Sequence, residues 1–277
     1  MEIVQYLIHL GLAKVEATDR QGWAALHCAC RGDRVNVVCH LIQDCGANVE
    51  ATDHQGVTPL MLASLKGNLE VVELLVELGQ AEGTSRGPVG LFLAIGMGHL
   101  KVVCYFVERC KVNAKVTDRD ANTLLHHAAR KGHVEVVKYL VELNCRAIVN
   151  ATNNHGQTAL LLACMAGHLE VVKLLVELGK AKVEIAESNG STTLLCALQE
   201  GYLDLEKYLV EKCKANLGAV DNNGHTLLHH AARGGNLAMM TLTNQGIYCK
   251  ISDRNGLITM HLACRGGSCS IGWWDTV

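Results

Sequence analysis

The chain has 277 residues, with 25 lysines and arginines against 27 acidic residues and a formal net charge of −2 at pH 7. Hydrophobic residues make up 49% and charged residues 19%, which excludes the low hydrophobicity and high charge of a disordered chain. No apolar run approaches the roughly 18 residues of a membrane span, and the near-neutral charge gives no argument for a polyanionic or membrane partner.

The first 18 residues contain a short apolar segment, EIVQYLIHLG, without the basic start and long apolar stretch of a secretory signal. We therefore expect a reducing compartment, the cytoplasm, with the nucleus as an alternative. The thirteen cysteines are odd in number and scattered in spacing. In such a compartment most of them are interpreted as small buried apolar residues rather than disulfide partners.

A unit of about 34 residues recurs from Asp19 onwards. The best preserved copies are DHQGVTPLMLASLKGNLEVVELLVELG, from Asp53, and NNHGQTALLLACMAGHLEVVKLLVELG, from Asn153. Residues 1–18 match only the second half of a unit. We divide the chain into a partial repeat with the second helix only (1–18), seven repeats (19–252), a second partial repeat (253–267) and an unmatched tail (268–277). Because both terminal units are incomplete, we expect the array to be part of a longer one.

Each unit has the same sequence of local signals. It opens with a D-x-x-G turn, in which glycine tolerates positive φ and aspartate can bond to nearby amides. A threonine follows at the expected helix N-cap, at Thr58, Thr123, Thr158, Thr192 and Thr226. A short helix, a glycine and a second helix with apolar residues at helical spacing complete the unit. Neither helix can bury its apolar face alone, so the units must stack.

The recurring blocks resemble those of ankyrin repeats over nearly the whole chain. They are TPLM at Thr58, TLLH at Thr123 and Thr226, TALL at Thr158, and variants of G-H-L-E-V-V at Gly98, Gly132 and Gly167. The resemblance implies an all-α fold, an ankyrin-repeat α-solenoid of helix-turn-helix units with projecting hairpin loops. It also implies protein recognition along a concave surface, so we expect no catalytic activity, no cofactor, no metal and no small-molecule substrate.

The histidines fit this interpretation. By the resemblance, the histidine after the repeated leucine bonds to the threonine and to loop backbone and braces neighbouring repeats, at His27, His126, His229 and His261. The doublets His126-His127 and His229-His230 point about 100° apart on a helix, which disfavours binding of one ion. No zinc-spaced His/Cys cluster, nucleotide-binding glycine motif or nucleophile elbow occurs.

The partner-binding surface is predicted from repeat position. By the resemblance, positions two, three and five of each unit lie on the loop tip, and positions thirteen and fourteen face the groove. Only Asp120 and Glu200 are acidic there, whereas the basic residues are Arg20, Arg31, Lys66, Arg86, Arg119, Arg130, Lys131, Arg233, Arg254 and Arg265. This asymmetry predicts a groove that prefers acidic or phosphorylated protein segments. The alternative is that these arginines serve packing and are neutralised by the turn aspartates.

Three further residues of the opening turns complete the predicted partner-binding set: Trp23, His54 and His225. Trp23 is either an exposed contact residue or a side chain folded against the neighbouring loop. Nucleic acid is not expected, because no aromatic residue other than Trp23 interleaves the charges.

The sequence thus favours an intracellular protein-interaction scaffold or adaptor. One alternative is the regulatory ankyrin segment of a longer enzyme, ligase adaptor or channel. The other is a metal or redox sensor that uses the cysteines.

Overall fold

The computed structural model describes residues 2–11, 13–78, 87–143, 146–235, 252–254 and 256. The chain forms two compact units, Met1–Val116 and Thr117–Val277, and each is described by itself. Within the described residues, regular structure is helical, and β-structure is limited to short bridges such as Thr117 with Thr123. The predicted all-α repeat fold is confirmed.

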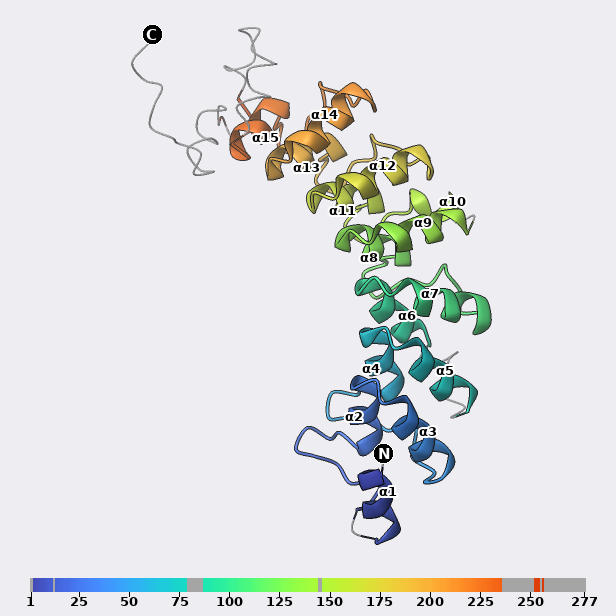
Figure 1. The fold of residues 1–277 in the computed structure, drawn as a ribbon. Coiled ribbons are helices and arrows are strands. Elements are labelled where there is room, and N and C mark those ends of the chain that lie inside the picture. Colours follow the sequence, from blue (N-terminus) through green and yellow to red (C-terminus); the bar gives the residue numbers. More distant parts are fainter. Residues whose placement is uncertain are drawn as a thin grey trace. The chain divides into compact units, whose positions relative to one another are not determined.

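In the first unit, two rows of helices run through successive repeats (Figure 1). The inner row packs α2 on α4 and α4 on α6, and the second row packs α3 on α5 and α5 on α7. A π-helical turn, Tyr105–Arg109, continues α7. The helices of this unit are α1 (Glu2–His9), α2 (Ala25–Arg31), α3 (Val35–Gln43), α4 (Pro59–Lys66), α5 (Leu69–Glu77), α6 (Gly87–Gly96) and α7 (Leu100–Cys104).

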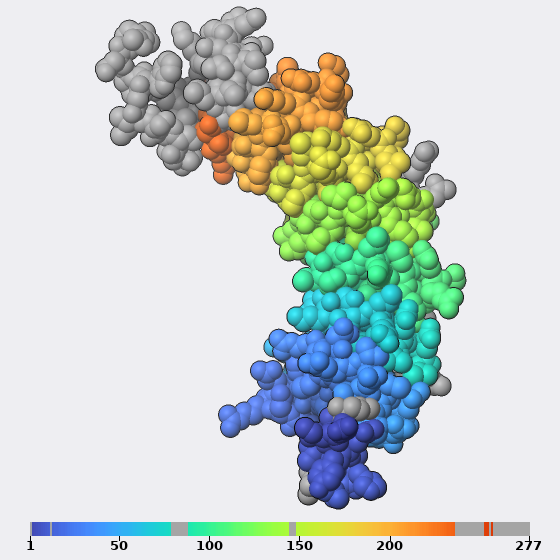
Figure 2. Space-filling view, viewed as in Figure 1, coloured from blue at the N-terminus to red at the C-terminus, as the bar shows by residue number. Residues whose placement is uncertain are grey.

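The second unit repeats this two-row arrangement. The inner row packs α8 on α11, α11 on α13 and α13 on α15, and the second row packs α9 on α12 and α12 on α14. The space-filling view shows continuous contact between its successive repeats (Figure 2). Its helices are α8 (Leu124–Lys131), α9 (Val134–Glu142), α10 (Arg146–Val149), α11 (Ala159–Met165), α12 (Leu169–Glu177), α13 (Thr193–Glu200), α14 (Leu203–Glu211) and α15 (Leu227–Arg233).

The core follows the repeat pattern of the sequence. The inner helices approach closely because an alanine recurs at the contact between them, for example Ala63, Ala128 and Ala163, each fully buried. The second helices α5, α9 and α12 each bury a valine pair and a leucine, such as Val171, Val172 and Leu175, whereas α14 buries Leu205 and Leu209 without a valine pair. Burial of these apolar groups between repeats is the main stabilising term of the fold.

Helix ends are set by the predicted threonines and glycines. The Oγ1 atoms of Thr58, Thr123 and Thr158 accept hydrogen bonds from backbone amides of the first turn. Thr192 occupies the same position, but its hydroxyl makes no such bond, so the prediction of a side-chain cap is wrong there. Gly132 ends α8 at φ +75°, and a Cβ added there would lie 2.6 Å from Nδ1 of His168 in the next repeat. Glycine is therefore required by both conformation and space.

The cysteine interpretation is correct in part. Cys30, Cys164 and Cys196 are buried, and burial raises the pKa of Cys196 to about 12. Of the nine cysteines within the described residues, five others are half-buried and Cys28 is exposed, so the expectation that most cysteines are buried is wrong for this part of the chain. None of these nine cysteines forms a disulfide in the structure.

Some predicted features lie outside the described residues. These are Arg86, His261, Arg265, the tail 268–277 and most of the partial repeat 253–267, of which Asp253, Arg254 and Gly256 are described.

Candidate functional site: loop tips and inner helices

Five of the opening turns within the described residues are closed by the side chain of their own first residue, whereas in the Glu187 turn the Ser191 N–H donates to Asn189 Oδ1. Asp118 Oδ1 accepts from the backbone N–H groups of Asp120 (2.9 Å) and Asn122 (2.8 Å). The same pair of bonds recurs at Asp19, Asp53, Asn153 and Asp221. The backbone N–H of Trp23 is the largest influence that lowers the pKa of Asp19, because the bond stabilises the carboxylate. The loop tips are therefore ordered by short, charge-assisted bonds.

Successive loop tips are also linked to each other through the backbone. In the first unit, the His54 N–H donates to the carbonyl oxygen of Gln21 (3.1 Å). In the second unit, the equivalent bonds run from residue 154 to 120, from 188 to 155, from 222 to 189 and from 254 to 223, at 2.8–3.0 Å. The loop tips of each unit therefore form a connected strip rather than separate loops.

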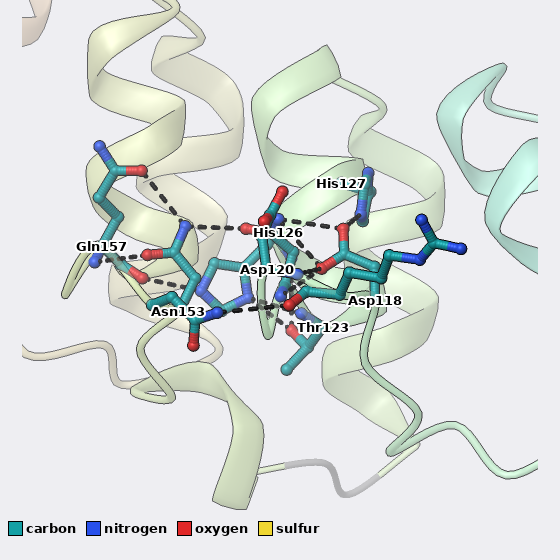
Figure 3. Close-up of polar contacts among 10 residues, drawn as sticks. Asp118, Asp120, Thr123, His126, His127, Asn153 and Gln157 are labelled. Atoms are coloured by element: carbon teal, nitrogen blue, oxygen red, sulfur yellow. Dashed lines mark hydrogen bonds and ion pairs between the residues drawn. The ribbon is translucent and has the colours of Figure 1, made fainter.

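A buried histidine fastens each inner helix to the following turn. His126 Nδ1 accepts from the Thr123 N–H (3.1 Å), and its Nε2 donates to the carbonyl oxygen of Gln157 (2.9 Å; Figure 3). His27 repeats this with the Ala24 N–H and the Val57 carbonyl. Burial lowers the pKa of His126, which keeps the ring neutral with its proton on Nε2. The bracing role expected for this histidine position is confirmed in both units.

A second polar layer lies beside this histidine. His127 Nε2 lies 2.8 Å from Asp118 Oδ2, which also accepts from Asn122 Nδ2 at 3.0 Å. Asn122 Oδ1 in turn accepts from Asn153 Nδ2 of the next repeat at 2.8 Å. One oxygen of the turn aspartate thus holds the turn, and the other binds side chains of the inner helix and turn.

The predicted basic residues lie on the surface. In the first unit, Arg20, Arg31, Lys66 and the turn residue His54 are exposed. In the second unit, five residues are exposed and are called here the basic surface: Arg119, Arg130, Lys131, Arg233 and Arg254. Asp120 and Glu200, the two predicted acidic exceptions, are exposed as well.

Trp23 is folded against the neighbouring loop, the second of its two predicted placements. Its Nε1 donates to Asp53 Oδ2 at 3.0 Å, and its ring stacks on His27 with centroids 6.4 Å apart. The guanidinium carbon of Arg31 lies 5.1 Å from the centre of the Trp23 ring. Arg31 is therefore held over an aromatic face.

His225 departs from its expected place at the loop tip. Its side chain is only 16% exposed and lies between two carboxylates, with Nδ1 2.9 Å from Asp221 Oδ2 and Nε2 3.0 Å from Asp253 Oδ2. His230 Nε2 contacts the same Asp221 oxygen at 3.3 Å. Asp221, His225 and His230 were not predicted from the sequence to lie together. The sequence signal is an aspartate followed by histidines four and nine residues after it.

In the part of the chain that the structure describes, no helix has the length and apolarity needed to cross a bilayer. The chain matches relatives over limited segments. It is 27% identical over 138 residues to the transient receptor potential cation channel subfamily A member 1 of Drosophila melanogaster, covering 47% of this chain and 11% of that protein. It is 37% identical over 91 residues to alpha-latroinsectotoxin-Lt1a of Latrodectus tredecimguttatus (31% and 6%). It is 35% identical over 88 residues to the mitochondrial liver isoform of glutaminase of Rattus norvegicus (30% and 14%).

The family profile described as "Ankyrin repeats (3 copies)" matches residues 1–87, 91–186, 143–221 and 194–272. These segments span both units and nearly every repeat defined above. The chain belongs to the ankyrin repeat family.

Proposed function

We propose that the chain is a protein-interaction module that binds acidic or phosphorylated segments of a partner protein through its loop tips and inner helices. Ankyrin repeats are generally protein-interaction modules. The observation that carries the finer proposal is the basic surface of the second unit, whose five side chains are all exposed. They are presented by ordered elements, because Arg119 and Arg254 lie on the linked loop tips and Arg130 and Lys131 end α8.

Charge distribution supports an acidic partner. The whole chain is slightly acidic at −2, so attraction of an anionic segment must come from a local field. Many acids lie on the second helices instead, including the exposed Glu70, Glu135 and Glu170. Arginine binds carboxylate and phosphate oxygens in bidentate geometry, and exposed charges of this kind raise association rates more than they raise affinity.

The test is a charge-reversed variant with a matched control. Arg119→Glu, Arg130→Glu and Lys131→Glu change three residues of the basic surface. Lys138→Glu, Lys207→Glu and Lys212→Glu make the same change of net charge at exposed positions of α9, α14 and the end of α14. At low salt, the first variant should associate with an acidic or phosphorylated peptide at least about tenfold more slowly, and its rate should depend less on salt.

The control variant should keep most of the wild-type rate and salt slope. Both variants should retain the helical circular dichroism of the wild type, because every mutated side chain is exposed. Equal losses in the two variants would show a general effect of net charge, and no loss in the first would show that the basic surface does not bind. Either result contradicts the proposal.

The scaffold or adaptor role and the compartment belong to the same proposal. We place the protein in a reducing compartment, the cytoplasm or the nucleus, because its thirteen cysteines are odd in number and scattered in spacing, unlike the paired cysteines of a disulfide framework. Fractionation of source cells tests this placement: recovery of the protein from the cytoplasmic or nuclear fraction supports it, and recovery only from a secreted fraction contradicts it.

A second candidate function is favoured by the comparisons. The relatives described above are a channel, a toxin and an enzyme by name, and the matched segments are 6–14% of their length. The module can thus serve as a regulatory segment of a longer enzyme, ligase adaptor or channel. An immunoblot of source cells with an antibody to this chain tests it, because a band far above 29.9 kDa favours this candidate over a free-standing adaptor.

A further inference from the structure

One turn of the second unit gathers three metal-ligating side chains. Asp221, His225 and His230 each present one ligand atom, and these atoms all lie within 4.8 Å of one another. Asp221 Oδ2 is 2.9 Å from His225 Nδ1 and 3.3 Å from His230 Nε2. In a tetrahedral site with ligands about 2.0–2.2 Å from the ion, ligand atoms lie about 3.3–3.6 Å apart. Shifts of a few tenths of an ångström would therefore bring the Asp221–His225 and Asp221–His230 atom pairs to tetrahedral ligand spacing.

The hydrogen bonds of His230 leave one of its ring nitrogens able to bind an ion. The bracing histidines cannot, because a backbone N–H fixes the lone pair on Nδ1 and the proton on Nε2, as in His126 and His229. No donor within the described residues points at His230 Nδ1, so its proton can move there and free Nε2.

Asp253 of the following repeat places a carboxylate beside the ring nitrogen of His225 that faces away from the proposed ion. Its Oδ2 lies 3.0 Å from His225 Nε2, on the side of the ring opposite Asp221, and its side chain is fully buried. A carboxylate that accepts from the far nitrogen of a ligating histidine fixes the ring orientation and raises its basicity. His225 has the arrangement of such a ligand, because Nδ1 lies beside Asp221 Oδ2 and Nε2 lies beside the carboxylate of Asp253.

We propose that Asp221, His225 and His230 form a binding site for a divalent transition-metal ion, with Zn²⁺ as the natural probe. Two imidazole nitrogens and one carboxylate oxygen suit Zn²⁺ and its neighbours rather than Mg²⁺ or Ca²⁺. A water molecule completes the four ligands, and the ion enters past His225, whose side chain is 16% exposed. The metal-site proposal does not rest on the proposed partner-binding function: none of the three residues belongs to the basic surface, and His225, which was predicted to bind a partner, lies between carboxylates instead.

The chain supplies its own controls. The equivalent residues of the Asp118 repeat are Asn122 and His127, and Asn122 Nδ2 bonds to Asp118 there at 3.0 Å. His225→Asn therefore reproduces an arrangement that the fold already contains and removes one ligand. His230→Leu places the leucine found at this position in two other repeats, at Leu62 and Leu162. Asn122→His builds the complete ligand set in the Asp118 repeat.

The experiment measures bound Zn²⁺ per full-length chain after equilibrium dialysis, with thermal unfolding in parallel. All variants keep the same thirteen cysteines, so binding to thiols cancels in the difference. Wild type should bind one more ion than His225→Asn or His230→Leu and gain a larger rise in Tm with Zn²⁺. Asn122→His should bind one more ion than wild type, and Asp253→Asn should weaken the site about tenfold or more.

The Co²⁺ form provides a spectroscopic check, because a nitrogen and oxygen site gives visible ligand-field bands without the thiolate charge-transfer band. Those visible bands should be present in wild type and lost in His225→Asn. Equal Zn²⁺ stoichiometry and equal Tm shifts in wild type and both ligand variants would overturn the proposal. So would an Asn122→His variant that folds and binds no additional ion.

Discussion

Replacing His126 with alanine should destabilise the fold more than any neighbouring polar substitution. The ring is fully buried and joins two backbone groups of different repeats, the Thr123 N–H at 3.1 Å and the Gln157 carbonyl at 2.9 Å. Each buried group left without its partner costs about 1–3 kcal/mol. The two together give a loss of about 2–6 kcal/mol, to which the cavity left by the ring adds.

The control is His127→Ala on the next residue of the same helix. The side chain of His127 is 31% exposed and contacts Asp118 Oδ2 at the edge of the turn, so its loss should cost about 0.5–1.5 kcal/mol. Urea unfolding followed by far-ultraviolet circular dichroism gives both free energies of unfolding. If the two variants differ by less than about 1 kcal/mol, the bracing interpretation of His126 is refuted.

Acid should destabilise the fold from below pH 6.5, because burial lowers the pKa of His126 from its ordinary value of 6.5. The stability that the neutral ring contributes is present above pH 6.5 and is lost, by up to about 1.4 kcal/mol per pH unit, as the pH falls towards the folded-state pKa. Urea unfolding from pH 8 to pH 5 measures this loss, and a stability that does not change with pH would contradict the prediction. Gly132→Ala should lower the free energy of unfolding by at least about 1 kcal/mol, because φ is +75° and the added Cβ meets His168. Gly96→Ala, at the end of α6 with open space around the added Cβ, should be neutral or stabilising by about 0.5 kcal/mol, and equal losses in the two alanine variants would contradict the steric argument. Leu75→Ala should cost about 2–5 kcal/mol, since Leu75 is fully buried; thermal unfolding measures it, and a loss below 1 kcal/mol would show a poorly packed core.

Much of the fold is predictable from the sequence because each repeat carries its own local signals. Thr123 and Gly132 mark the ends of α8 by capping and by positive φ, and these effects depend on residues only a few positions away. Thr192 shows the limit of such reasoning: it begins α13 without a side-chain bond, since the identity of a cap residue does not fix its hydroxyl rotamer.

The contacts between side chains are less predictable from the sequence than the helices are. His225 was expected on the loop tip by repeat position, but its contacts come from Asp221 in its own turn and Asp253 in the next repeat. Repeat position gives the backbone location of a residue and not the partners that the neighbouring repeat offers. Trp23 illustrates the same point, because its indole N–H donates a hydrogen bond to Asp53, 30 residues away in the sequence.

Selection of binding peptides from an unbiased random library tests the proposed partner chemistry most directly. If the basic surface binds partners, peptides captured by the wild-type chain should be enriched in acidic residues, and phosphorylation of the library should increase capture. The variant carrying Arg119→Glu, Arg130→Glu and Lys131→Glu should lose most of these peptides, whereas the variant with three lysine reversals on the second helices should keep them. Neutral or basic selected peptides, or equal capture by the two variants, would contradict recognition of acidic segments by this surface.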